Sequence, residues 1–119
     1  MTTAPTILDR YFELSDLAGH DGAAFDELIA LFTPDATIEP NGAASVDGTV
    51  GITGFFRAFL ARNAELKHVW SVEETPEGLL ASWAVAGRRN SGEVFALAGW
   101  DLARLATDGR IAHLQVKAA

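Results

Sequence analysis

The chain has 119 residues, of which 49% are hydrophobic and 21% charged, a composition typical of one globular domain over residues 1–119 and not of a disordered chain. Its net charge of −7 argues against nucleic acid or an anionic membrane as a partner, because phosphate groups are bound by basic surfaces. The absence of cysteine excludes disulfides, thiolate metal sites and a cysteine nucleophile.

The N-terminal sequence MTTAPT has no apolar segment of the kind found in secretory signals. No run in the chain approaches the roughly 20 apolar residues of a membrane span. We therefore expect a cytoplasmic protein.

Three helices are expected in the first half of the chain. The first covers about residues 7–18, where apolar side chains recur on one helical face. Asp21 is suited to cap a second helix, which Pro34 is expected to end. A third helix has the clearest apolar stripe, formed by Ile52, Phe55, Phe56, Phe59 and Leu60.

Strand patterns dominate the rest of the chain. A short strand is expected over residues 35–40, followed by a loop into the third helix. Four longer runs cover residues 66–74, 79–89, 93–105 and 110–118, and the turn sequences TPEG, NSG and TDG between them have hairpin length. Helices followed by an antiparallel meander indicate an α+β fold.

This order of elements resembles the nuclear transport factor 2-like superfamily, in its SnoaL-like and ketosteroid-isomerase-like branch. The similar stretches are RYFEL, LIALFTPDATIEP, DGTVGITGFFRAF and WDLARLATDGRIAHLQV. The resemblance implies a cystatin-like cone, in which three N-terminal helices pack in the concavity of a strongly bent, mainly antiparallel sheet around a pocket. It also implies a homodimer through the outer sheet face. We expect no cofactor.

Asp101 is the first candidate for chemistry. Alternation along its strand places it on one face with Phe95, Leu97, Gly99, Ala103 and Leu105, and Trp100 on the other. A carboxylate in an apolar row must be paired or protonated. In ketosteroid isomerase a protonated Asp and a Tyr form an oxyanion hole, and the resemblance places Asp101 and Tyr11 at these positions. The alternative is structural: Asp101 bonded to a neighbouring element, and Tyr11 a core side chain whose hydroxyl finds one partner, which could be Asp101.

The resemblance also locates the isomerase's general base, and that position holds Pro40. Glu39 precedes it, and a shift of one residue in a strand turns a side chain to the opposite face. We therefore interpret Glu39 as a surface charge. The alternative is a bulge before Pro40 that turns Glu39 back toward the pocket, where it would replace the base. The protein is not expected to be a standard ketosteroid isomerase.

His68 is a candidate replacement, because some SnoaL-like members carry a pocket histidine on this strand and histidine suits proton transfer near neutral pH. The alternative, which the sequence favours, is a histidine at the open rim of the sheet. His20 is expected in solvent and His113 on the convex face, at a dimer contact. The spacing of the three histidines does not bring them together, so no metal site is expected.

The pocket is expected to be apolar and to take a small apolar molecule. Its predicted lining residues are Ile38, Phe56, Trp70, Trp83 and Leu97, whereas Trp100 is expected on the outer, dimer-forming face. The alternative is that the tryptophans only fill core and interface.

Two functions are consistent with these residues. The first is an isomerase, cyclase or hydrolase that acts by proton transfer on an enolisable, polyketide- or steroid-like substrate, with Asp101 and Tyr11 stabilising an oxyanion and His68 or a water moving the proton. The alternative is a non-catalytic module of the same fold that binds a small ligand or dimerises.

Overall fold

Three helices and six strands make up the computed structural model, which describes residues 5–119. The helices are α1 (Ile7–Leu17), α2 (Gly22–Ala30) and α3 (Gly48–Arg62). The strands are β1 (Phe32–Glu39), β2 (Val46–Asp47), β3 (Asn63–Thr75), β4 (Gly78–Arg89), β5 (Val94–Leu105) and β6 (Ile111–Ala118). The short strand β2 was not predicted.

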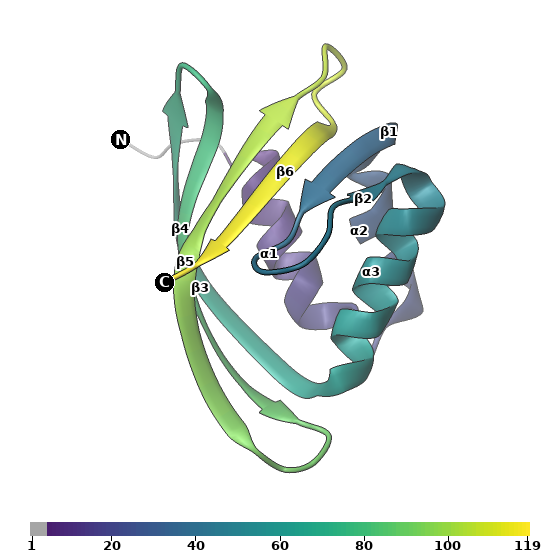
Figure 1. The fold of residues 1–119 in the computed structure, drawn as a ribbon, viewed down its shortest axis with the longest axis vertical. Coiled ribbons are helices and arrows are strands. Elements are labelled where there is room, and N and C mark those ends of the chain that lie inside the picture. Colours follow the sequence, from purple (N-terminus) through teal and green to yellow (C-terminus); the bar gives the residue numbers. More distant parts are fainter. Residues whose placement is uncertain (1–4) are drawn as a thin grey trace.

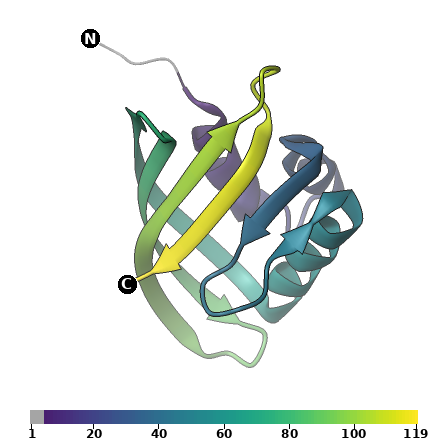
Figure 2. The ribbon, with the colours of Figure 1, turned by 45° about the horizontal axis from the view of Figure 1, so that its top comes forward.

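The six strands form one mixed sheet in the order β2-β1-β6-β5-β4-β3. Neighbouring strands are antiparallel except for β1 and β6, which run parallel. The long strands β3, β4 and β5 bend around the three helices, which lie on the concave side (Figure 1). A view turned by 45° shows that the sheet is open and that β1 and β2 lie beside α3 (Figure 2). The predicted α+β cone is confirmed.

Local capping explains where the first two helices begin. The Thr6 hydroxyl accepts from the Asp9 N–H and the Asp9 carboxylate accepts from the Thr6 N–H, so that α1 starts with a capping box. The Asp21 carboxylate accepts from the N–H groups of Ala23 and Ala24, as predicted for the start of α2.

The predicted end of α2 at Pro34 is wrong. The helix ends at Ala30, and Pro34 lies inside β1. The strand starts early because Phe32 pairs with Ile111 of β6, and the Ile111 N–H donates to the Leu31 carbonyl. Pro34 falls where the β1–β6 register is irregular, between Phe32 and Thr37, so its missing N–H interrupts no regular ladder.

The core lies between the helices and the concave face of the sheet. Its fully buried members are Leu8, Leu28, Ala36, Ile38, Ile52, Ala81, Ala103, Ile111 and Leu114. Of the residues that alternation placed on the inner face of β5, Phe95, Leu97 and Asp101 line the pocket and Ala103 is buried, whereas Leu105 is exposed at the strand end, where the register with β6 shifts. None of the helices within residues 5–119 is long and apolar enough to cross a bilayer.

Candidate functional site

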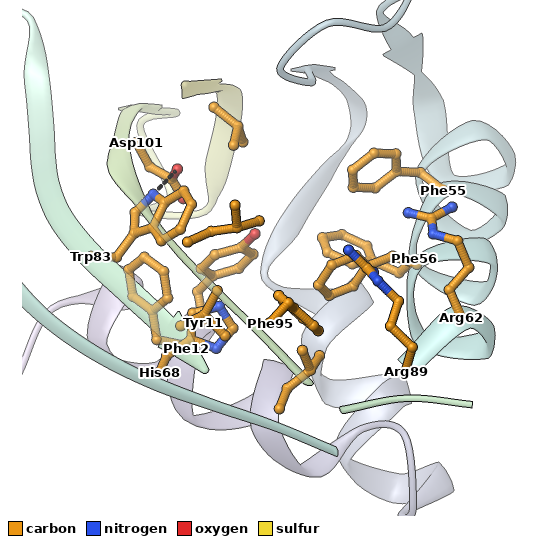
Figure 3. A pocket seen from close by; sticks show the side chains of 15 residues that line it. Tyr11, Phe12, Phe55, Phe56, Arg62, His68, Trp83, Arg89, Phe95 and Asp101 are labelled. Carbon is orange, nitrogen blue, oxygen red and sulfur yellow. Dashed lines mark hydrogen bonds between the residues drawn. The ribbon is translucent and has the colours of Figure 1, made fainter. Parts of the chain in front are cut away.

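A pocket of about 230 Å³ opens between α1, α3 and the bent sheet (Figure 3). Most of its wall is aromatic or aliphatic, and its polar members come from five elements: α1, α3, β3, β4 and β5. The lining residues are Tyr11, Phe12, Phe55, Phe56, Phe59, Arg62, Leu66, His68, Trp83, Val85, Arg89, Phe95, Leu97, Asp101 and Val116. Tyr11, His68 and Asp101, the three predicted chemical groups, therefore share one cavity.

Asp101 is 2% exposed and is held by the indole of Trp83, whose Nε1 donates to Asp101 Oδ1 at 2.8 Å (Figure 3). Burial raises the pKa of Asp101 to about 7, against the lowering effect of the Trp83 hydrogen bond. Because Oδ1 accepts from the indole, Oδ2 is the oxygen free to carry a proton. The carboxyl group can therefore act as a hydrogen-bond donor at and below neutral pH.

Gly99 explains how the Trp83 ring reaches Asp101. Gly99 lies opposite Trp83 in the β4–β5 register and faces inward like Asp101. A Cβ atom at this position would lie 2.8 Å from Trp83 Cζ2 and 2.0 Å from the Lys117 carbonyl oxygen. Only glycine leaves room for the indole to lie across the strand toward the next inward residue.

Tyr11 projects from α1 into the middle of the pocket (Figure 3). Burial and the negative charge of Asp101 raise the pKa of its hydroxyl well above the ordinary value, so the group stays a proton carrier and donor. The hydrogen bonds among residues 5–119 include none between Tyr11 and Asp101. The predicted partner of Asp101 is replaced by Trp83.

His68 is buried in the pocket wall and not at the rim that the sequence favoured, because β3 begins five residues earlier, at Asn63. Its Nδ1 lies 2.6 Å from Asp16 Oδ1, and its backbone N–H donates to the same carboxylate at 3.0 Å. A carboxylate only accepts, so Nδ1 carries a proton, and in the neutral ring the lone pair is therefore on Nε2. The His68 and Trp83 rings meet edge to face at 6.3 Å.

These groups supply the parts of a proton-transfer site. An oriented imidazole with a free Nε2 can remove a proton from carbon, and neutral Asp101 and Tyr11 can donate hydrogen bonds to the oxygen on which charge develops. No three histidine, aspartate or glutamate side chains within residues 5–119 gather closely enough to hold a metal ion.

A sequence model of the SnoaL-like domain matches residues 8–114, which is most of the chain. The chain belongs to the SnoaL-like family. A comparison with curated proteins finds no match.

Solved structures place this SnoaL-like chain among nuclear transport factor 2-like proteins. One such protein, of unknown function, from Exiguobacterium sp. 255-15 shares 38% identity over 96% of this chain and 98% of its own, with a TM-score of 0.87. SalBIII, an epoxide hydrolase/cyclase-like enzyme in pyran ring formation of salinomycin, shares 18% identity over 95% and 88%, with a TM-score of 0.79. A candidate polyketide cyclase from Xanthomonas campestris pv. campestris shares 16% identity over 93% and 86%, with a TM-score of 0.76. The last two similarities show the shared fold.

The five predicted substrate-binding residues of this SnoaL-like chain divide into two groups. Phe56, Trp83 and Leu97 line the pocket. Ile38 faces inward as predicted but is fully buried in the core, outside the pocket lining. Trp70 also lies outside it: its ring stacks on Phe12 with centroids 5.3 Å apart, and its Nε1 donates to Asp9 at 2.8 Å.

Glu39 lies outside the pocket, as alternation predicted. Its carboxylate pairs with His113 Nε2 at 2.6 Å, and both side chains are partly exposed on the convex side of the β1–β6 pair. Pro40 follows the strand and has no group to replace a base. His20 is exposed, with Nε2 2.7 Å from the Ala64 carbonyl oxygen.

Sequence reasoning missed Asp16, although a signal for it existed. Asp9, Phe12 and Asp16 are spaced i, i+3, i+7 and so share one helical face, while His68 and Trp70 share one strand face. The two carboxylates can each accept a hydrogen bond from one of the two rings if the helix packs on that strand. This pattern becomes recognisable only once α1 is known to pack on β3.

Proposed function

We propose that this SnoaL-like protein is a small-molecule enzyme that enolises a ketone, with His68 as the general base and Asp101 and Tyr11 as donors to the enolate oxygen. The observation that carries the proposal is the Asp16–His68 pair, which leaves the His68 Nε2 available in the same pocket as the buried carboxyl group of Asp101. This pair supplies the base that Pro40 cannot.

The reaction would begin when His68 Nε2 takes a proton from the carbon next to the substrate carbonyl. The C–H electron pair becomes the enolate double bond, and the carbonyl oxygen gains the negative charge. Asp101 Oδ2 and the Tyr11 hydroxyl donate hydrogen bonds to that oxygen, in a site where apolar walls strengthen them.

Two reactions can follow from this enolate. In an isomerisation, protonated His68 returns the proton to a different carbon. In a cyclisation, the enolate carbon attacks a second carbonyl carbon of the same molecule, a C–C bond forms, and the new alkoxide takes the proton from His68. The small, mostly aromatic pocket supports an apolar substrate in either case.

The test is deuterium exchange at the carbon next to the carbonyl of 2-tetralone, followed by proton NMR in D₂O. The wild-type protein should catalyse exchange, and His68→Gln should lose about 100-fold or more, the usual contribution of a general base. Asp16→Asn should also lose activity, because an amide can donate to Nδ1 and so favours the tautomer that carries its proton on Nε2. His20→Gln, outside the pocket, is the matched control.

Activity should also fall as pH rises above about 7, because Asp101 then loses the proton that it donates. If wild type and His68→Gln exchange deuterium at the same rate, His68 is not the base. If neither catalyses exchange but 2-tetralone binds, the pocket serves non-catalytic binding.

A further inference from the structure

Two arginines that the proton-transfer chemistry does not use, Arg62 and Arg89, line the pocket at the end away from Asp101 (Figure 3). Arg62 is the last residue of α3 and Arg89 the last of β4. Their backbones are adjacent, because the Asn90 N–H donates to the Arg62 carbonyl at 3.1 Å and Asn63 pairs with Arg89 in the sheet. The two arginines are therefore held next to each other by the backbone.

Arg89 is held in a defined position. It faces inward, whereas its neighbour Arg88 faces outward and is exposed. Its Nη1 donates to Asn63 Oδ1 at 3.0 Å, and its guanidinium lies 4.2 Å from the centre of the Phe95 ring. Asn63 is itself buried and fixed by a bond from Nδ2 to the Phe59 carbonyl. This arrangement orients Arg89 and leaves most of its N–H donors unused.

Arg62 and Arg89 form no close ion pair with a carboxylate of the described residues, so both can bind a carboxylate of a ligand. Three surface arginines each bind a carboxylate at 2.6 or 2.7 Å: Arg10, Arg88 and Arg110. Within residues 5–119, Arg62, like Arg57 and Arg104, has no carboxylate oxygen within 4.0 Å, and Arg89 meets only the largely exposed Glu93, at 3.8 Å. The 3.8 Å distance is too long for a hydrogen bond.

We propose that the pocket selects a substrate with an apolar body and a carboxylate at one end, and that Arg62 and Arg89 bind this carboxylate. The planar guanidinium fork matches a carboxylate with two parallel hydrogen bonds. The two cations lie together at one end of a mostly apolar pocket in a protein of net charge −7, and an anionic group is the ligand chemistry that they fit.

The sheet register sets the length of such a substrate. Val85 lies opposite His68, and Arg89 follows four residues later on β4. At about 3.3 Å per residue, this separates the two sites by roughly 13 Å along the strand, less the reach of the arginine side chain. The acid must therefore be long enough to place its ketone near His68 while its carboxylate meets the arginines.

Calorimetric titration with naphthalene-2-carboxylate and its neutral carboxamide, at pH 7 and low salt, tests the proposal. The wild-type protein should bind the acid more tightly by about tenfold or more. Arg62→Gln and Arg89→Gln should each remove most of this preference, because acid affinity should fall by a larger factor than carboxamide affinity. Arg88→Gln is the matched control, because Arg88 has the same charge at the next position but faces outward.

Equal affinity of the wild-type protein for acid and carboxamide would overturn the proposal. An equal loss of acid affinity in all three variants would also overturn it, because it would show that only the overall charge of the protein affects binding. The Arg62 side chain is exposed and has no carboxylate partner within residues 5–119, so Arg62→Gln keeps the test decisive if circular dichroism shows Arg89→Gln to be unfolded.

The acid is called a substrate only because the proposed function makes the pocket an active site, whereas its binding requires no turnover. A preference for the acid without any deuterium exchange would overturn the proposed function and leave the acid site standing. Exchange on 2-tetralone without a preference for the acid would overturn the acid site alone.

Discussion

At the scale of single residues, Asp101 is the carboxyl group whose protonation the fold changes near neutral pH. It is almost fully buried, it receives one hydrogen bond, from Trp83, and its pKa rises to about 7. The folded protein thus binds this proton more tightly than the unfolded chain does. The resulting stabilisation is complete below the ordinary pKa of 3.8 and is lost as pH rises through about 7.

This linkage predicts how Asp101→Asn changes the pH dependence of stability. Asparagine stays neutral and can still accept from Trp83, so only the ionisation is removed. The free energy of unfolding of wild type minus that of the variant should fall by about 3 kcal/mol between pH 5 and pH 8. Urea denaturation at the two pH values measures it, and a constant difference would show that Asp101 ionises as freely as in the unfolded chain.

At the scale of elements, the docking of α1 on β3 places the candidate base. Asp9 accepts from Trp70 Nε1 and Asp16 binds both the ring and the backbone of His68. Two carboxylates that are seven residues apart on α1 thereby bind two rings that are two residues apart on β3. Although partial burial by itself raises the pKa of Asp9, hydrogen bonds from Thr6 and Trp70 outweigh it and hold the pKa below its ordinary value.

Asp9→Ala should lower the free energy of unfolding by roughly 2 kcal/mol at neutral pH, because it removes both the capping box and the bond to Trp70. Glu13→Ala is a suitable control, since Glu13 lies on the same helix and pairs only with Arg10 at the surface. Urea denaturation of both variants measures the difference. Equal losses would contradict a docking role for Asp9.

Most elements were predictable from local patterns, and the errors have local causes. Helical periodicity located α3, and alternation located the inward face of β5 up to Ala103. Pro34 misled because a proline after a helix usually stops it, whereas here pairing with β6 had already ended α2. His68 was assigned to the rim because the extent of β3, which pairs with β4 along its whole length, is not visible in its own sequence.

At the scale of the whole molecule, part of the convex face of the sheet carries an exposed apolar patch. Val69 is 64% exposed, Val94 76% and Trp100 39%, and between them lie small side chains: Ala84, Ala86, Ala96 and Ala98. An exposed apolar patch of this kind suits contact with the same patch of a second copy. We propose that the protein forms a homodimer through it, as expected from the sequence.

Sedimentation velocity should therefore show a dimer of the wild-type chain, and Trp100→Glu should shift it toward the monomer, because a carboxylate would be buried at the centre of the contact. Val50→Glu is the control, since Val50 is an exposed valine on α3, away from the sheet. A monomeric wild-type chain, or the same dimer in Trp100→Glu, would overturn the proposal.

The sequence by itself determined the order of most elements and the inward direction of Tyr11 and Asp101, and the cone architecture followed from the family resemblance. Helical and strand periodicity are local properties, written within a few neighbouring residues. Only the tertiary structure decided the partners: Asp16 with His68 across 52 positions, Trp83 with Asp101 across 18, and two arginines at one end of the pocket. Such pairings depend on how a whole sheet bends around its helices, and no short stretch of sequence encodes that curvature.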